Sequence, residues 1–297
     1  MSLIESKNKS EARIYQEILA AVRAGNIGLT SDIDGTLSPI ALTPSESFVP
    51  EEVKAALEKI HASGKFKLVA MVSGRSSLDG RRLVGLPQLL YLGNHGMEAL
   101  NPHGENPVLA ELVVMYKPLV GAALDLTRQN LLAHPAQDFG FNSQDTSSVG
   151  WENALHFEDK GITASIHYRL CPDPDLARQT ILAEVRAVCA NTGLVITEGR
   201  LVVEIRPPVV INKGTVLEDL ALQYGLESLI FLGDDLTDVD AFLALRKLEQ
   251  MGGKFKQGFS IGVLSPEMNP KVRDTADYMV DGVSGVAAFL NWLVAQL

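Results

Sequence analysis

The chain has 297 residues, of which 46% are hydrophobic and 21% are charged, and its formal net charge is -10. This composition predicts a folded protein with a packed core rather than a disordered chain. The acidic balance argues against nucleic acid or an anionic membrane as the main partner, because both favour a basic surface.

Cysteine usage and the N-terminal residues bear on the cellular compartment. Two cysteines, Cys171 and Cys189, are too few for a disulfide scaffold or a structural zinc site and fit a reducing environment. Residues 1–20 lack the apolar stretch of a signal peptide, and no apolar run is long enough to span a bilayer. We therefore expect a cytoplasmic protein without a membrane partner; no oligomer is predicted, and a monomer is plausible.

The first hundred residues alternate between helical and extended patterns. Apolar residues at helical spacing are followed by Gly25-Asn26, which ends the first helix. Pro50 with two acidic residues opens the second helix. The expected elements are helices over 14–24 and from residue 50, and strands over 27–33, 66–72 and 89–93.

The pattern changes between residues 101 and 199. A helical segment over 111–130 precedes a polar stretch of low regularity over 131–155. Alternation then predicts a strand over 162–169, and a helix over 174–190 and a strand over 194–197 follow. We interpret residues 101–199 as a separate α+β unit.

From residue 201 strands and helices alternate again. Strands are expected over 201–205, 229–232 and 259–263, and helices over 213–224, 239–248 and 283–296. Such alternation predicts a parallel, doubly wound sheet with helices on both faces. The predicted fold is therefore an α/β, Rossmann-like core formed by residues 1–100 and 200–297, with an α+β cap domain inserted between them.

The first expected strand ends in Asp32-Ile33-Asp34-Gly35-Thr36. Open parallel sheets bind ligands at the carboxyl ends of their strands. At such a place one carboxylate can attack phosphorus while the other protonates the leaving oxygen. The alternative is a plain Asp-Gly turn; a calcium loop is excluded because Gly35 comes too early and no glutamate closes the loop.

A second acidic group, Gly233-Asp234-Asp235-Leu236-Thr237-Asp238, follows the strand at 229–232. Three acids in five positions provide oxygen ligands for a hard cation such as Mg²⁺. Capping of the next helix by Asp235 or Thr237 is the alternative. It accounts for one of these acids but not for three.

Two further residues are candidates for binding an anion. Lys213 opens a helix, where a positive charge is unfavourable unless it faces an anion, although a surface lysine is the simpler interpretation. Ser73 follows the strand at 66–72 and offers a hydroxyl, with the N–H groups of Gly74 and Arg75 beside it. An ordinary turn serine is the alternative.

Taken together and in this order, these four segments resemble the motif set of the haloacid dehalogenase superfamily. The resemblance implies that Asp32 is the nucleophile and Asp34 the general acid and base, and that Ser73 and Lys213 hold the phosphoryl oxygens. It implies a Mg²⁺ ion bound by Asp32, Asp234 and the backbone carbonyl of Asp34. Asp235 and Asp238 are expected to orient these ligands or Lys213.

Further strings resemble the trehalose-6-phosphate phosphatases. They are Gly93-Asn94-His95-Gly96, Glu158-Asp159-Lys160-Gly161, His167-Tyr168-Arg169, Glu204-Ile205-Arg206-Pro207-Pro208 followed by Asn212-Lys213-Gly214, and the acidic segment Gly233-Asp234-Asp235-Leu236-Thr237-Asp238 already described. The resemblance implies hydrolysis of trehalose 6-phosphate to trehalose and phosphate, the last step of trehalose biosynthesis, through an aspartyl-phosphate.

The same resemblance implies which side chains contact the small-molecule sugar phosphate. Glu158, Lys160 and Glu204 are expected to bind sugar hydroxyls, and charged groups form the stronger hydrogen bonds to them. Thr36, Gly74, Arg75 and His95 are expected to contact the substrate or its phosphate. The alternatives are a solvated edge pair for Glu158 and Lys160, and a structural role for His95.

Two other functions stay open at this level. Another sugar phosphatase with the same type of cap, acting on sucrose 6-phosphate or a mannosyl phosphate, would keep the motifs but differ in the cap. A non-catalytic sugar-phosphate sensor would be expected to lack Asp34 or Lys213, and both are present. The polar stretch over 134–155 is longer than the resemblance leads us to expect.

Overall fold

The computed structural model of the chain describes residues 10–43, 46–141, 150–265 and 268–297. It divides the chain into two compact units. The core unit comprises Met1–Ala41, Ser45–Val108 and Ile211–Leu297, and the inserted unit comprises Leu109–Val210 together with Leu42–Pro44. The predicted cap, residues 101–199, begins 8 residues before Leu109 and ends 11 residues before Val210, the bounds of the longer segment of the inserted unit.

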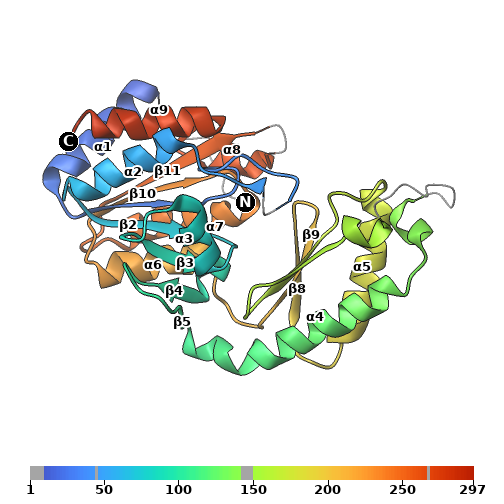
Figure 1. Ribbon diagram of the computed structural model, residues 1–297. Coiled ribbons are helices and arrows are strands. Elements are labelled where there is room, and N and C mark those ends of the chain that lie inside the picture. Colours follow the sequence, from blue (N-terminus) through green and yellow to red (C-terminus); the bar gives the residue numbers. More distant parts are fainter. Residues whose placement is uncertain (1–9, 44–45, 142–149, 266–267) are drawn as a thin grey trace, which may run out of the picture. The chain divides into compact units, whose positions relative to one another are not determined.

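The core unit is built on one sheet of eight strands in the order β12-β11-β10-β1-β2-β3-β4-β5 (Figure 1). Strands β12 to β3 of this order pair in parallel, and β4 pairs antiparallel with β3. The strands are β1 (Ile27–Ser31), β2 (Phe66–Val72), β3 (Leu90–Gly93), β4 (Glu98–Leu100), β5 (Val108–Leu109), β10 (Ser228–Gly233), β11 (Gln257–Leu264) and β12 (Tyr278–Asp281).

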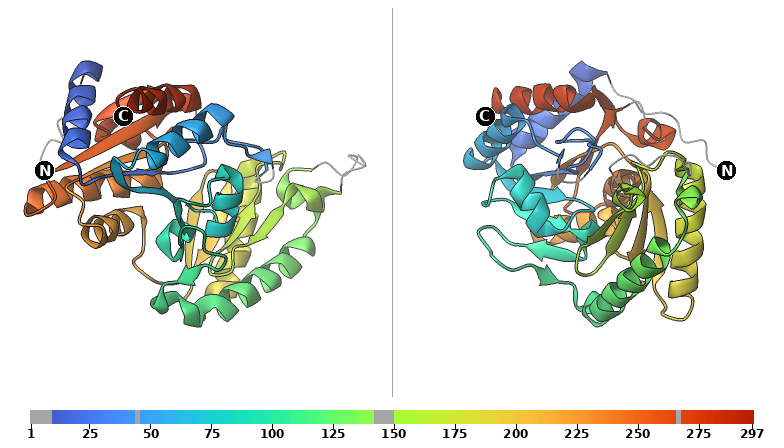
Figure 2. Two further views of the ribbon diagram at one scale, coloured as in Figure 1. Left: turned by 60° about the vertical axis from the view of Figure 1, so that its left-hand side comes forward. Right: turned by 45° about the vertical axis from the view of Figure 1, so that its right-hand side comes forward.

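Helices cover both faces of this sheet and bury two apolar clusters (Figures 1 and 2). One face is covered by α1 (Glu11–Ala24), α2 (Glu51–Ala62), α3 (Ser77–Val84) and α9 (Gly282–Val294). The other is covered by α6 (Lys213–Gln223), α7 (Leu236–Met251) and α8 (Pro270–Thr275). Every residue of β1 and β10 is buried, as expected for strands that are covered by helices on both faces.

The inserted unit has its own antiparallel sheet in the order β6-β7-β9-β8. Its strands are β6 (His156–Asp159), β7 (Ala164–His167), β8 (Val195–Gly199) and β9 (Val202–Arg206), and its long helices are α4 (Lys117–Leu132) and α5 (Pro174–Cys189). The helices pack together on the apolar face of the sheet, which carries Ile166, Val203 and Ile205 (Figure 2). Because side chains alternate along a strand, Glu204 and His167 belong to the opposite face.

The predicted fold class is confirmed: a Rossmann-like α/β core carries an inserted α+β unit. The helix predicted over 111–130 differs in detail, because Glu111–Tyr116 forms a 3-10 helix before α4 begins. Part of the polar stretch over 134–155, residues 142–149, lies outside the described residues. Among the helices that are described, none is long and apolar enough to cross a membrane.

Candidate active site

The candidate residues of the core unit meet at the carboxyl ends of three neighbouring strands. Strand β1 lies between β2 and β10 in the sheet. Asp32 follows β1, and its N–H donates to the Leu232 carbonyl of β10 at 2.9 Å. The strands β1 and β10 therefore stay paired up to the acidic motifs. Ser73 follows β2, and Asp234 follows β10. Residues about 200 positions apart in the sequence are thereby brought to one edge of the sheet.

Three buried carboxylates form the centre of this site. Asp32, Asp234 and Asp238 each offer an oxygen, and these oxygens lie within 4.8 Å of one another. Burial, together with the neighbouring carboxylates, raises the pKa of Asp32 well above its usual value, although the Lys213 charge acts in the opposite direction. The cluster is thus strongly electronegative. A set of carboxylate oxygens in this arrangement fits a hard divalent cation.

Lys213 is the cation that the cluster already contains. Its side chain is 2% exposed, and Nζ lies 2.9 Å from Asp32 Oδ1 and 2.6 Å from Asp238 Oδ1. Burial alone would lower the pKa of Lys213, but the charges of Asp238 and Asp32 raise it above its usual value. Two of the three carboxylates thus contact one ammonium group, and this group of four side chains carries more acidic than basic groups.

The local sequence explains how a lysine comes to open a helix. Asn212 caps α6 by accepting a hydrogen bond from the N–H of Thr215 at 3.0 Å, and Thr215 Oγ1 accepts one from the N–H of Asn212 at 3.1 Å. Lys213 is consequently the first residue of α6, where the helix dipole disfavours a positive charge. Its contacts with Asp32 and Asp238 offset that cost.

Asp238 connects Lys213 to the start of α7. Its Oδ1 accepts from Lys213 Nζ, and its Oδ2 accepts from the N–H groups of Asp234 and Asp235, both at 2.9 Å. Asp235 is the N-cap of α7, and its side chain accepts from the N–H of Leu236 at 2.7 Å. Asp235 is therefore the N-cap and Asp238 is the N3 residue of the same capping box, so capping describes two of the three acids but not Asp234.

The turn after β1 brings Asp34 and Thr36 to the same region. Gly35 has φ of +82°, and a Cβ at this position would lie 2.1 Å from Asp234 Oδ2. Only glycine therefore combines the left-handed turn with so close an approach of the two acidic loops. Thr36 Oγ1 donates to Asp234 Oδ1 at 3.2 Å, so Thr36, predicted to contact substrate, contacts an acid of the cluster here.

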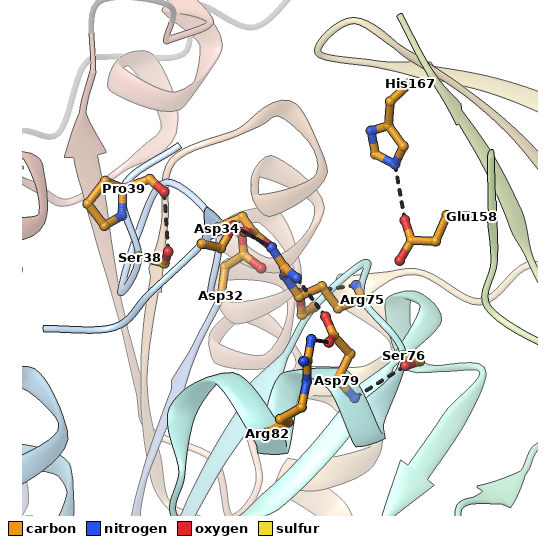
Figure 3. Close-up of polar contacts among 12 residues, drawn as sticks. Asp32, Asp34, Ser38, Pro39, Arg75, Ser76, Asp79, Arg82, Glu158 and His167 are labelled. Carbon is orange, nitrogen blue, oxygen red and sulfur yellow. Dashed lines mark hydrogen bonds and ion pairs between the residues drawn. The ribbon is translucent and has the colours of Figure 1, made fainter. Parts of the chain in front are cut away.

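Asp34 lies beside Arg75 (Figure 3). Arg75 Nε donates to Asp34 Oδ2 at 2.6 Å and Arg75 Nη2 donates to Asp34 Oδ1 at 2.7 Å. Arg75 was predicted to contact substrate, and nothing in the sequence indicated that it pairs with carboxylates. One of them, Asp79 in α3, was not among the predicted residues.

Ser73, Gly74 and His95 form the wall on the β2 side. Ser73 is 3% exposed, and its Oγ accepts from the N–H of Arg75 at 3.2 Å. The His95 ring lies over Gly74, where a Cβ would come within 2.9 Å of it. His95 has φ of +60° and donates its N–H to the Ser73 carbonyl at 2.9 Å. Such a conformation is costly for a residue with a Cβ, and it places the ring beside the turn.

The inserted unit holds its predicted sugar-binding residues on one face of its sheet. Lys160 Nζ lies 3.0 Å from Glu204 Oε1, and both side chains are 9% exposed. Glu158 Oε2 lies 3.0 Å from His167 Nε2, from the neighbouring strand. Thr163 Oγ1 also donates to Glu204 Oε1, at 3.4 Å. His167 and Thr163 were not among the predicted site residues, although His167 stands in one of the strings that carried the resemblance.

A core of this topology with an inserted unit is a fold that is also found in solved structures of haloacid dehalogenase-like hydrolases. The structure is similar to a haloacid dehalogenase-like hydrolase from Bacteroides thetaiotaomicron, with a TM-score of 0.58, 16% identity and coverage of 90% of this chain and 98% of the other. It is also similar to the C-terminal domain of trehalose-6-phosphate phosphatase from C. albicans, with a TM-score of 0.71, 17% identity and full coverage of both chains.

The sequence narrows this class to one family. The family described as trehalose-phosphatase matches residues 30–127 and 143–284. A curated relative, probable trehalose-phosphate phosphatase E from Arabidopsis thaliana, is 31% identical over 302 residues, which cover 97% of this chain and 75% of the relative. The chain belongs to the trehalose-phosphatase family.

Proposed function

We propose that this chain hydrolyses trehalose 6-phosphate to trehalose and phosphate in a magnesium-dependent reaction with an aspartyl-phosphate intermediate. Membership of the trehalose-phosphatase family supports the reaction and its substrate. The observation that carries the mechanism is the buried cluster of Asp32, Asp234 and Asp238 around Lys213 at the ends of β1 and β10.

In the first half of the proposed reaction, a carboxylate oxygen of Asp32 attacks phosphorus, and the bond from phosphorus to the sugar oxygen breaks. Asp34 gives its proton to that oxygen, so trehalose leaves as an alcohol. In the second half, Asp34 takes a proton from water, whose oxygen attacks the phosphorus of the aspartyl-phosphate. The bond to Asp32 breaks, and inorganic phosphate is released.

The remaining residues of the core unit bind and orient the phosphate in this proposal. Lys213 and Ser73 hold phosphoryl oxygens, and the turn Gly74-Arg75 and His95 contact the substrate beside them. Lys213 reaches these oxygens from a fixed position, since Asp238 accepts a hydrogen bond from its Nζ at 2.6 Å. Fixed donors of this kind lower the barrier because they need no rearrangement in the transition state.

The carboxylates of the cluster fit Mg²⁺, which prefers oxygen ligands. We assign Asp32, Asp234 and the backbone carbonyl of Asp34 as its ligands. Both oxygens of Asp238 already accept hydrogen bonds, so we assign Asp238, with Asp235, to orienting the site. When bound, the ion offsets the repulsion between the Asp32 carboxylate and the phosphate dianion.

Glu158, Lys160 and Glu204 are the proposed sugar-binding residues. The two charged groups Lys160 and Glu204 already contact each other and are largely buried, so they present hydrogen-bonding groups in fixed positions. Binding energy from such a remote part of the substrate supports catalysis at the phosphate.

The direct test is phosphate release from a panel containing trehalose 6-phosphate, sucrose 6-phosphate, a mannosyl phosphate and glucose 6-phosphate, with Mg²⁺ or with EDTA. We expect preference for trehalose 6-phosphate and loss of activity in EDTA. Asp32→Asn should lower turnover by orders of magnitude while Asp219→Asn, the same change at an exposed position of α6, should not. Preference for another sugar phosphate would refute the substrate, and a fully active Asp32→Asn would refute the mechanism.

A further inference from the structure

Arg75 joins two carboxylates that come from different parts of the core unit (Figure 3). Two of its nitrogens hold both oxygens of Asp34, at 2.6 and 2.7 Å. A third nitrogen, Nη1, donates to Asp79 Oδ2 at 2.6 Å. The Arg75 side chain is only 9% exposed, so these contacts are largely shielded from solvent and screened less by salt.

The bidentate contact with Arg75 restrains the orientation of the Asp34 carboxylate as well as its distance from Arg75. A guanidinium group is planar and rigid, and a carboxylate that accepts two parallel hydrogen bonds from it is fixed in orientation as well as position. Asp34 itself stands directly before Gly35, at the start of the turn after β1, and its side chain is 39% exposed. The orientation of Asp34 therefore depends on where Arg75 is held.

Asp79 is well suited to hold Arg75. It lies in the first turn of α3, whose N-cap Ser76 accepts a hydrogen bond from the Asp79 N–H at 3.3 Å. The start of the same helix is fixed by buried Glu98, whose Oε1 accepts from the N–H of Ser77 at 2.5 Å. The carboxylate that faces Arg75 thus stands on a fixed element.

Helix α3 also packs against the loop that carries the catalytic pair. Gly80 approaches Ile33, the residue between Asp32 and Asp34, so closely that a Cβ on Gly80 would lie 3.1 Å from Ile33 Cδ1. Helix α3 and the loop after β1 are therefore in direct packing contact. A carboxylate on this helix can set the position of a side chain on the loop.

We propose that Asp79 is a positioning residue which acts through Arg75 to hold Asp34 in the orientation needed for proton transfer to the leaving oxygen. The inference rests on the proposed function, in which Asp34 is the general acid. Asp79 touches neither the substrate nor the reacting atoms in this arrangement. Its loss should therefore slow the step that depends on Asp34 and spare a reaction that does not.

The leaving group distinguishes these two cases. Release of a sugar alkoxide requires a proton, whereas p-nitrophenolate leaves with little help from an acid. The quantity to compare is kcat/KM, because it includes only the steps up to phosphoryl transfer and not the later hydrolysis of the aspartyl-phosphate. A residue that merely stabilises the fold would affect both substrates to the same extent.

The experiment measures kcat and KM of the Mg²⁺-loaded wild type, Asp79→Ala, Asp79→Asn and Arg82→Ala on trehalose 6-phosphate and on p-nitrophenyl phosphate. For Asp79→Ala we expect kcat/KM on trehalose 6-phosphate to fall roughly tenfold to a hundredfold, mainly through kcat, since a small misplacement costs about that much. On p-nitrophenyl phosphate it should stay within about threefold. Asp79→Asn keeps the shape and one acceptor, so its loss should be smaller and equally selective.

Arg82→Ala is the matched control. Arg82 Nη2 contacts the other oxygen of Asp79, Oδ1, at 2.6 Å from an exposed position on the same helix. Its removal should leave both activities within about twofold, as for most exposed ion pairs. Equal losses on both substrates, or no loss on trehalose 6-phosphate in either Asp79 variant, would overturn the inference alone. A wild type inactive on trehalose 6-phosphate would overturn the proposed function and this inference with it.

Discussion

The change Asp238→Asn tests the hydrogen-bonding arrangement at the centre of the site. Asp238 accepts on both sides, from Lys213 Nζ through Oδ1 and from two backbone N–H groups of the β10–α7 turn through Oδ2. An amide has the same shape but only one acceptor oxygen. Whichever way it is turned, its NH₂ group faces donors. The variant must therefore lose either the contact with Lys213 or the pair of backbone hydrogen bonds.

The expected loss of stability can be estimated from the hydrogen bonds that Asp238→Asn removes. A hydrogen bond to a charged group contributes about 1.5 to 3 kcal/mol, and removing one partner of a buried ion pair costs about 3 to 5 kcal/mol. Asp238 and Lys213 are 0% and 2% exposed, but Lys213 keeps its contact with Asp32 at 2.9 Å, so its charge is not left unpaired and the smaller value applies. We expect the free energy of unfolding of the core unit to fall by about 1.5 to 3 kcal/mol. Activity should fall as well, because either Lys213 or the β10–α7 turn is then held less firmly.

Urea denaturation followed by tryptophan fluorescence measures this difference. The chain has two tryptophans, Trp151 in the inserted unit and Trp292 in α9 of the core unit. In a Trp151→Phe background the signal reports on the core unit alone. The matched control is Asp235→Asn, the same change at the N-cap of α7, where asparagine serves as well as aspartate and the effect should stay below about 0.5 kcal/mol. A loss for Asp238→Asn as small as that of the control would refute the reasoning.

Three further predictions follow from single sites. Hydrogen bonds to Asp138 and Glu184 raise the pKa of His134 in the folded protein. The stabilisation that protonated His134 contributes is therefore complete below about pH 6.5, the pKa of a free histidine, and is lost as the pH rises through the raised pKa of the folded state. The difference in melting temperature between the wild type and His134→Gln should accordingly become smaller from about pH 6 to about pH 9. Added Mg²⁺ should raise the melting temperature of the wild type and do so much less for Asp234→Ala, and an equal rise in both would contradict the ligand assignment. Glu204→Gln should lower kcat/KM for trehalose 6-phosphate roughly tenfold or more and leave p-nitrophenyl phosphate hydrolysis nearly unchanged, whereas equal losses would indicate a folding defect.

The strands of the core and the residues at their ends were predictable from the sequence. The apolar run over 66–72 predicted a buried strand, and the structure confirms β2 over the same residues. The order of elements then determines that the strand ends lie at one edge of a parallel sheet. For this reason Asp32 and Asp234 could be placed together although they are about 200 residues apart.

Several short elements were not predicted, because they carry too few residues for a periodic pattern. Strand β4 has three residues, and β12 and β6 have four each. Helix α3 contains Gly80, which weakens a helical pattern, and its eight residues give little more than two turns. The missed helix is the one that carries Asp79.

The contacts of Arg75 and Asp79 also lay beyond sequence reasoning. Arg75 was noted for its place after Ser73, and nothing in that turn indicates a partner 41 positions earlier in the chain. The partnership arises only when β1 and β2 pair and α3 folds back over their ends. A pattern along the chain reports on which face a residue lies, but not on which side chains meet there.

The charges of the site explain why an acidic protein can act on an anionic substrate. The overall charge of -10 requires positive charge to be supplied locally. In the core unit, the cations assigned to the site, Lys213 and Arg75, are each in contact with two carboxylates. These carboxylates outnumber the cations, so the two side chains do not by themselves make the site attractive to a phosphate dianion. Burial, together with the neighbouring carboxylates, raises the pKa of Asp32, the proposed nucleophile, which must be ionised to attack. A divalent cation held by the acidic cluster would remove both obstacles, so the charge balance of these residues supports the proposed requirement for Mg²⁺.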